Sequence, residues 1–88
     1  MKLVPSPSVL PGVAATDYPA VCRGVVDAFG LSPASDIVVG PEQIFWEFRR
    51  GEQVVGLEWD IWSGFIVTAN TPGSEQLVRE IAARLQQG

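Results

Sequence analysis

The chain has 88 residues, a formal net charge of −4, no histidine and one cysteine. This length allows one domain with a modest core, and the acidic charge argues against nucleic-acid binding, which requires a basic face. The absence of histidine removes the commonest general base and metal ligand, and a single cysteine excludes an internal disulfide and a multi-thiolate metal site. We therefore expect a protein that holds no cofactor and no metal.

Residues 1–15 are rich in proline, and we expect them to form an extended arm beside a single domain of residues 16–88. Pro5, Pro7 and Pro11 interrupt the apolar residues of this arm, so it lacks the unbroken apolar run of a secretory signal. The chain has no stretch near the roughly 20 apolar residues that a membrane-spanning helix needs. Together with the single thiol, these features predict a cytoplasmic protein without membrane contact.

Two stretches have the apolar spacing of amphipathic helices. The first covers residues 17–29 and is followed by Gly30, which can adopt the left-handed conformation that ends a helix. The second has its apolar stripe over residues 77–85. Here Thr71 and Pro72 predict the helix cap and the first helical position.

Between the two helices, apolar and other residues alternate, which predicts strands over residues 44–49, 54–60 and 64–70. The short apolar run of residues 37–39 leaves open a further strand. The predicted fold is therefore α+β, in the order α-β-β-β-α. It is a three-stranded antiparallel meander that both helices cover on one face.

The turns of the meander predict its register. A two-residue turn that starts at Arg50 would pair Trp46 with Val55 and place Phe45 opposite Gly56, where the ring has room to lie flat. One face then carries Ile44, Trp46, Phe48, Val55, Leu57 and Trp59, as burial requires. The second hairpin has a three-residue loop, and its predicted pairs are Asp60 with Gly64, Trp59 with Phe65, Leu57 with Val67 and Val55 with Ala69.

Ordinary nucleophilic catalysis has no support in the sequence. Cys22 lies within the apolar stripe of the first helix and has no histidine to activate it. Ser63 and Ser74 also lack a histidine partner, and the only lysine is Lys2 in the arm. We therefore expect a protein that is not an enzyme.

The candidate functional surface is the sheet face opposite Trp46 and Trp59. Alternation places Glu47, Glu58 and Asp60 on this face, and residues 42–70 as a whole hold five acidic and two basic residues. Paired carboxylates also serve glycosidases and metal sites, but an open sheet gives them no enclosing wall. Apolar side chains bordered by charges are typical of protein-binding surfaces. The predicted partner-binding residues are Phe45, Glu47, Val54, Glu58, Asp60, Trp62 and Ile66.

Trp62 lies in the predicted loop and has two alternatives. Its indole can fold back over Phe65 or Leu57, or it can remain exposed as an anchor for a partner.

The sequence favours a non-enzymatic interaction protein that binds a basic protein or a second copy of itself. One alternative is a small-molecule binding domain, with a pocket between helices and sheet walled by Trp46, Trp59 and Tyr18. Another is a homodimeric structural protein.

Three runs in the strand region carry a resemblance: SDIVVGPEQIFWEF from Ser35, GLEWD from Gly56, and GFIVTA from Gly64. With these runs, the chain resembles small acidic α+β bacterial proteins of unassigned function, including integron gene-cassette products and immunity-type proteins. The resemblance implies the same fold class and supports the fold more than any function. It implies no active-site residue.

Overall fold

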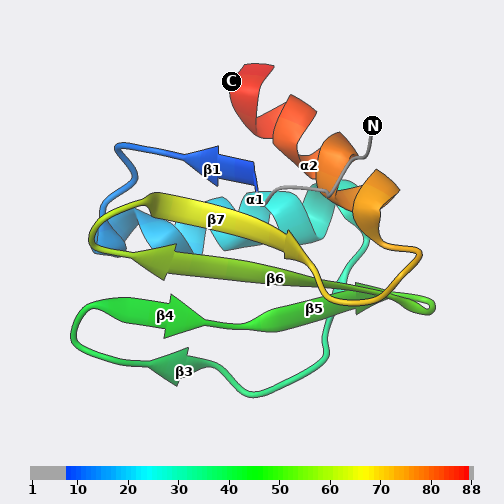
Figure 1. The fold of residues 1–88 in the computed structure, drawn as a ribbon, viewed down its shortest axis with the longest axis horizontal. Coiled ribbons are helices and arrows are strands. Elements are labelled where there is room, and N and C mark those ends of the chain that lie inside the picture. The colour runs from blue at the N-terminus through cyan, green and yellow to red at the C-terminus, as the bar shows by residue number, and fades with distance from the viewer. Residues whose placement is uncertain (1–7, 88) are drawn as a thin grey trace.

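The computed structural model describes residues 8–87 and shows an α+β fold with one antiparallel sheet (Figure 1). The predicted order of helix, meander and helix is confirmed, and the sheet is larger than three strands. The helices are α1 (Tyr18–Phe29) and α2 (Glu75–Gln87), and a 3-10 turn, Ala15–Asp17, precedes α1. The strands are β1 (Ser8–Leu10), β2 (Ser32–Pro33), β3 (Val38–Val39), β4 (Gln43–Phe45), β5 (Glu47–Arg50), β6 (Gln53–Asp60) and β7 (Gly64–Ala69).

The strands lie in the order β1-β7-β6-β4-β3, and β5 pairs with both β6 and β2. The further strand left open at residues 37–39 is present as β3, whereas no strand was predicted at the residues of β2. Part of the predicted arm forms strand β1, in which Leu10 lies opposite Phe65. Residues 1–7 of that arm lie outside the described residues.

The register of the second hairpin is confirmed, and that of the first is wrong by two residues. The turn contains Gly51 and Glu52 rather than starting at Arg50, because Arg50 pairs with Gln53. Gly51 has a φ of +63°, a conformation that glycine adopts without steric cost. A shift of two residues leaves every side chain on its predicted face but changes its cross-strand partner. Gly56 therefore lies opposite Glu47.

Helix α1 begins at Tyr18, one residue after its predicted start, and ends as predicted at Gly30, which has a φ of +65°. Pro19 fits the first turn, because the N–H groups there have no partner within the helix. Tyr18, Cys22 and Val25 form the buried stripe of the helix.

Helix α2 begins later than the predicted cap at Thr71 and first helical position at Pro72. Thr71 extends the sheet instead, because its Oγ1 accepts a hydrogen bond of 3.1 Å from the Val54 N–H. The buried Ser74 takes the position directly before the helix. Its carbonyl oxygen accepts the Val78 N–H at 3.0 Å, and its hydroxyl donates to the Thr71 carbonyl oxygen at 2.7 Å.

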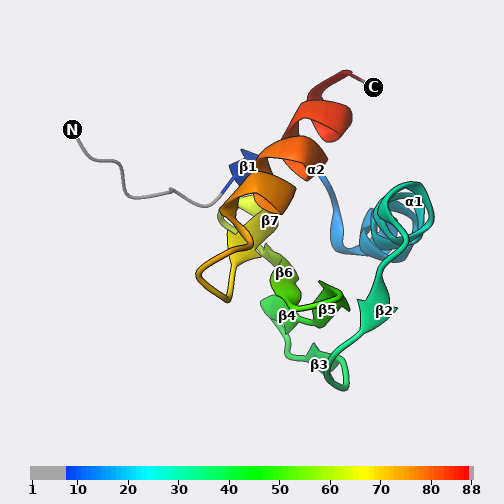
Figure 2. The same ribbon diagram turned by 90° about the vertical axis from the view of Figure 1, so that its right-hand side faces the viewer.

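The core lies between one sheet face and the two helices. Figure 2 shows α1 on one side of the sheet, and α2 packs against β1, β6 and β7. Trp46 and Trp59, predicted as core residues, are half-buried at its margin, where their indole N–H groups donate to the Ser35 and Val13 carbonyl oxygens at 3.1 and 2.7 Å. The buried residues of this core are Tyr18, Cys22, Val25, Leu31, Ile44, Phe48, Val55, Leu57, Phe65, Val67, Leu77, Val78 and Ile81.

Neither helix in the described part of the chain is long and apolar enough to cross a membrane.

Candidate functional site

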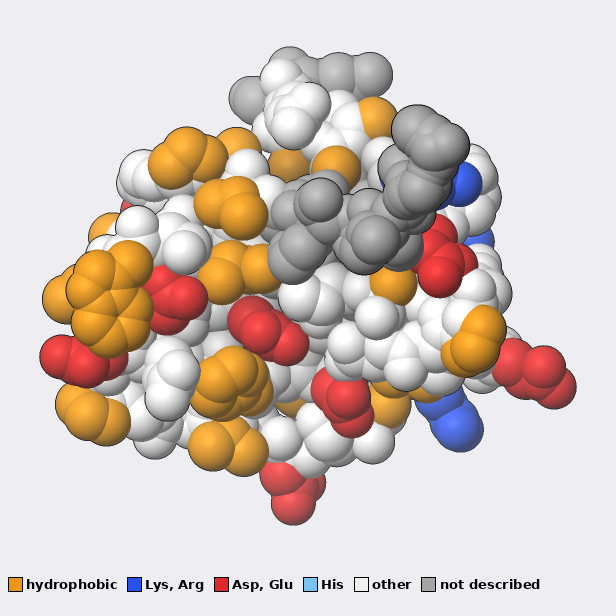
Figure 3. All heavy atoms as spheres, in the orientation of Figure 1, with side chains coloured by type: hydrophobic (Ala, Val, Ile, Leu, Met, Phe, Trp, Pro, Cys, Tyr) orange, Lys and Arg blue, Asp and Glu red, His pale blue; other side chains and the backbone are white. Residues whose placement is uncertain are grey.

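The sheet face that points away from α1 carries all six strand residues predicted to bind a partner. Figure 1 looks onto this face, with α1 behind the sheet. In the space-filling view of the same side, acidic side chains lie among hydrophobic ones, and basic side chains gather near one margin (Figure 3). We call these six residues the acidic sheet face: Phe45 on β4, Glu47 on β5, Val54, Glu58 and Asp60 on β6, and Ile66 on β7.

A row of apolar side chains crosses this face with one carboxylate in its middle. Val38 pairs with Phe45, Glu58 pairs with Ile66, and Ile66 pairs with Val9. The register of β4 and β6 places Phe45 opposite Glu58. The row therefore runs from one edge strand to the other. Val38, Phe45 and Val9 remain 59%, 42% and 44% exposed, and the sequence prediction missed Val38 and Val9.

A polar network lies beside this row, above Gly56. The Asn70 amide donates to a Glu47 carboxylate oxygen at 2.8 Å, and the Thr68 hydroxyl lies 3.3 Å from Oε2 of Glu58. A Cβ atom on Gly56 would come within 2.5 Å of Thr68 Oγ1 and 2.6 Å of Glu58 Oε2. The prediction that this space holds the Phe45 ring is wrong, because the register differs and polar side chains fill it.

Glu58 has the perturbed carboxyl group of the face. Burial raises the pKa of Glu58 above its ordinary value of 4.5, and the negative charges of Glu47 and Asp60 raise it further. The hydrogen bond from Thr68 opposes this shift of the pKa. The ionised form of Glu58 is thus less stable here than in water, and a nearby cation would stabilise it.

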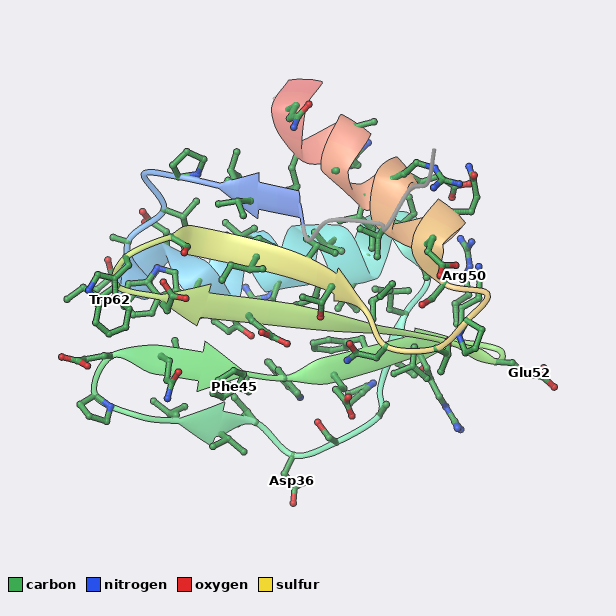
Figure 4. All side chains as sticks on the ribbon, in the orientation of Figure 1. Asp36, Phe45, Arg50, Glu52 and Trp62 are labelled. Carbon is green, nitrogen blue, oxygen red and sulfur yellow. The ribbon has the colours of Figure 1, made fainter. Side chains whose placement is uncertain are left out.

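Asp60 shapes the loop between β6 and β7. Its Oδ1 accepts the backbone N–H groups of Trp62 and Ser63 at 2.9 and 2.6 Å. Trp62 is 74% exposed, so the indole does not fold back over Phe65 or Leu57, and its role as an anchor for a partner stays a prediction. Figure 4 shows Trp62 at one end of the sheet, with Phe45 on the strand face and Glu52 at the opposite end.

Residues 8–87 contain no group of three histidine, cysteine, aspartate or glutamate side chains that could hold a metal ion. Burial raises the pKa of the Cys22 thiol to about 11, so the thiol is protonated at neutral pH.

An apolar groove of about 300 Å³ lies on the opposite side of the sheet, at α1. Trp46 lines it as predicted, but its other predicted walls, Tyr18 and Trp59, do not. The buried Tyr18 hydroxyl instead donates to the Leu57 carbonyl oxygen, and the Trp59 indole lies against Val13. The lining residues are Pro19, Cys22, Arg23, Val26, Pro33, Trp46 and Phe48.

Comparisons with protein-family models, curated proteins and solved structures give no match for this chain.

Proposed function

We propose that this protein is a non-enzymatic binding protein whose acidic sheet face binds a basic protein partner. The observation that carries the proposal is the row in which Glu58 lies between Phe45 and Ile66. It combines exposed apolar area with a carboxylate that the fold itself does not neutralise. Partner-binding surfaces have this composition, with apolar contacts at the centre and charges that set the orientation of the partner.

The charges on this face favour a cationic partner. Glu47, Glu58 and Asp60 share the face, and Arg49 is the one basic residue at an outward-facing strand position among residues 8–87. An acidic surface accelerates association with a basic protein at low salt. A lysine or arginine beside Glu58 would also offset the unfavourable burial of its negative charge.

A second copy of this chain is a weaker candidate for the same surface. A two-fold dimer through this face would place the patch that holds Glu47, Glu58 and Asp60 against a copy of the same patch. Like charges across an interface are unfavourable. The charges therefore favour a heterologous basic partner over a homodimer.

The resemblance to immunity-type and gene-cassette proteins supports the same kind of partner. A nucleic-acid-binding protein presents a basic surface, and an acidic sheet face can cover it. We place this binding in the cytoplasm, where the thiol of Cys22 stays reduced.

The test compares two charge reversals in affinity capture with the full chain. Glu58→Lys changes the centre of the acidic sheet face, and Glu52→Lys makes the same charge change at the opposite end of the sheet (Figure 4). We leave Asp60 unchanged because its carboxylate holds the loop. A basic protein captured by the wild type and by Glu52→Lys, and lost with Glu58→Lys, supports the proposal.

Capture that is equally strong with Glu58→Lys would exclude the acidic sheet face as the interface. Sedimentation of the isolated protein at high micromolar concentration distinguishes self-association. A dimer that Phe45→Asp dissociates would replace the basic partner with a second copy.

A further inference from the structure

The groove at α1 is built mainly from apolar side chains of three separate segments. Pro19, Cys22 and Val26 come from α1, Pro33 comes from β2, and Phe48 comes from β5. Trp46, between β4 and β5, completes the wall, and its ring centroid lies 4.6 Å from that of Phe48. The volume of about 300 Å³ is at the lower end of the range for small-molecule sites.

The wall of the groove has little free hydrogen-bonding capacity. The indole N–H of Trp46 already donates to the Ser35 carbonyl oxygen at 3.1 Å, which leaves the apolar ring as its contribution. The two prolines have no N–H to offer. A ligand would therefore fill the groove with an apolar body and gain its polar contact elsewhere.

Arg23 supplies the one charge among the lining residues. Its side chain is exposed, and the described residues give it no ion pair, since the pair that they form joins Arg50 to Glu80. Asp27 lies one helical turn further along α1 but does not pair with it. A guanidinium binds a carboxylate through two parallel hydrogen bonds, and an arginine beside apolar walls favours such a group.

We propose that this groove binds a small carboxylate with an apolar or aromatic body. The body lies against Trp46 and Phe48, and the carboxylate meets Arg23 at the rim. The lining has no carboxylate that would attract a cationic ligand instead. The site is independent of the acidic sheet face, because it lies on the other side of the sheet.

Three probes of one shape and different head groups test the charge preference. They are 3-phenylpropanoate, 3-phenylpropan-1-ol and 3-phenylpropylammonium, titrated into the ¹⁵N-labelled full chain. The indole N–H signal of Trp46 reports binding, and that of the exposed Trp62 is an internal reference. We expect saturable shifts of the Trp46 signal. The carboxylate should bind roughly two- to fivefold more tightly than the alcohol, as for an exposed ion pair, and the ammonium should bind weakest.

Two variants test the groove itself. Arg23→Gln should lower the affinity for the carboxylate to that for the alcohol. Arg84→Gln removes the same charge from an exposed position on α2 and should leave all affinities unchanged. Val26→Trp should fill the groove and abolish binding of all three probes, and Val26→Phe is the smaller insertion if the first variant does not fold.

A Trp46 signal that none of the three probes shifts would overturn the proposal. Equal affinity for the three head groups, or equal losses in Arg23→Gln and Arg84→Gln, would also contradict it. Glu58→Lys alters the opposite side of the sheet, so a failure of this groove and a failure of the acidic sheet face are separate results.

Discussion

The Tyr18 hydroxyl donates a buried hydrogen bond to the backbone carbonyl oxygen of Leu57. Leu57 lies in β6 opposite Trp46, and its N–H donates to the Trp46 carbonyl oxygen at 2.8 Å. The return bond from the Trp46 N–H is not among the hydrogen bonds of the described residues. The Leu57 carbonyl oxygen therefore accepts a helix side chain at the point where the pairing of β6 passes from β5 to β4.

Replacing Tyr18 by phenylalanine should destabilise the protein. The ring keeps its packing against Phe65, whose centroid lies 5.7 Å away, but the Leu57 carbonyl oxygen loses its partner. A buried acceptor without a partner costs about 1–2 kcal/mol. Urea denaturation should show this decrease in the free energy of unfolding. Trp62→Phe, at an exposed position, should stay within about 0.5 kcal/mol of the wild type, and a Tyr18→Phe protein as stable as this control would show that the bond contributes nothing.

The stability of the protein should depend on pH through Glu58. Because the fold raises the pKa of this carboxyl, the folded state binds its proton more tightly than the unfolded state does. Stability due to this group is present below the unfolded pKa and is lost as pH rises through the folded pKa. Glu58→Gln removes the loss, so its melting temperature should exceed that of the wild type at pH 7.

This advantage of Glu58→Gln should disappear in acid, where both proteins carry a neutral side chain at this position. Thermal melts at pH 7 and well below the ordinary pKa of 4.5 measure the difference. Glu52→Gln is the control, because Glu52 is exposed in the turn before β6. If the melting temperatures of the wild type and of Glu58→Gln changed in parallel with pH, the raised pKa of Glu58 would not be the cause of the pH dependence.

Two glycine substitutions should change stability in opposite directions. Gly56→Ala places a Cβ within 2.5 Å of Thr68 Oγ1, so the polar network must shift, and we expect a loss of about 1–2 kcal/mol. Gly24→Ala meets nothing within 4 Å on α1 and should gain about 0.5–1 kcal/mol through better helix propensity. Denaturant titrations of both variants measure the two effects. Equal free energies of unfolding in Gly56→Ala and Gly24→Ala would show that Gly56 is not needed for close packing.

Periodicity was enough to predict the helices and three main strands, because burial of one face requires it. It could not predict the start of α2, since the Thr71 hydroxyl bonds across the chain to Val54, a contact that no local pattern reports. The predicted register of the first hairpin was wrong because a turn at Arg50-Gly51 and a turn at Gly51-Glu52 bury the same faces of the strands. Alternation alone does not distinguish registers that differ by two residues.

The sequence predicted which strand residues share the candidate site, but it did not predict how they are arranged. Alternation placed Phe45, Glu58 and Ile66 on one face, but their alignment in a single row depends on the true register. Val9 joins that row through β1, a pairing between distant segments that the proline-rich sequence does not suggest. The exposure of Trp62 depends on how Asp60 bonds the loop, which spacing does not determine.

Trp62 should contribute to partner binding and not to folding. Trp62→Ala removes a side chain that is 74% exposed, so the free energy of unfolding should change by no more than about 0.5 kcal/mol. If the indole enters the interface, binding of the captured basic partner should weaken by about 2 kcal/mol, as for tryptophans at binding hot spots. Calorimetric titration measures this loss. Val39→Ala is the control: it shortens an exposed apolar side chain of β3, at a position that pairs with the core residue Ile44, and this variant should bind the partner normally. Wild-type affinity in Trp62→Ala would restrict the interface to the strands.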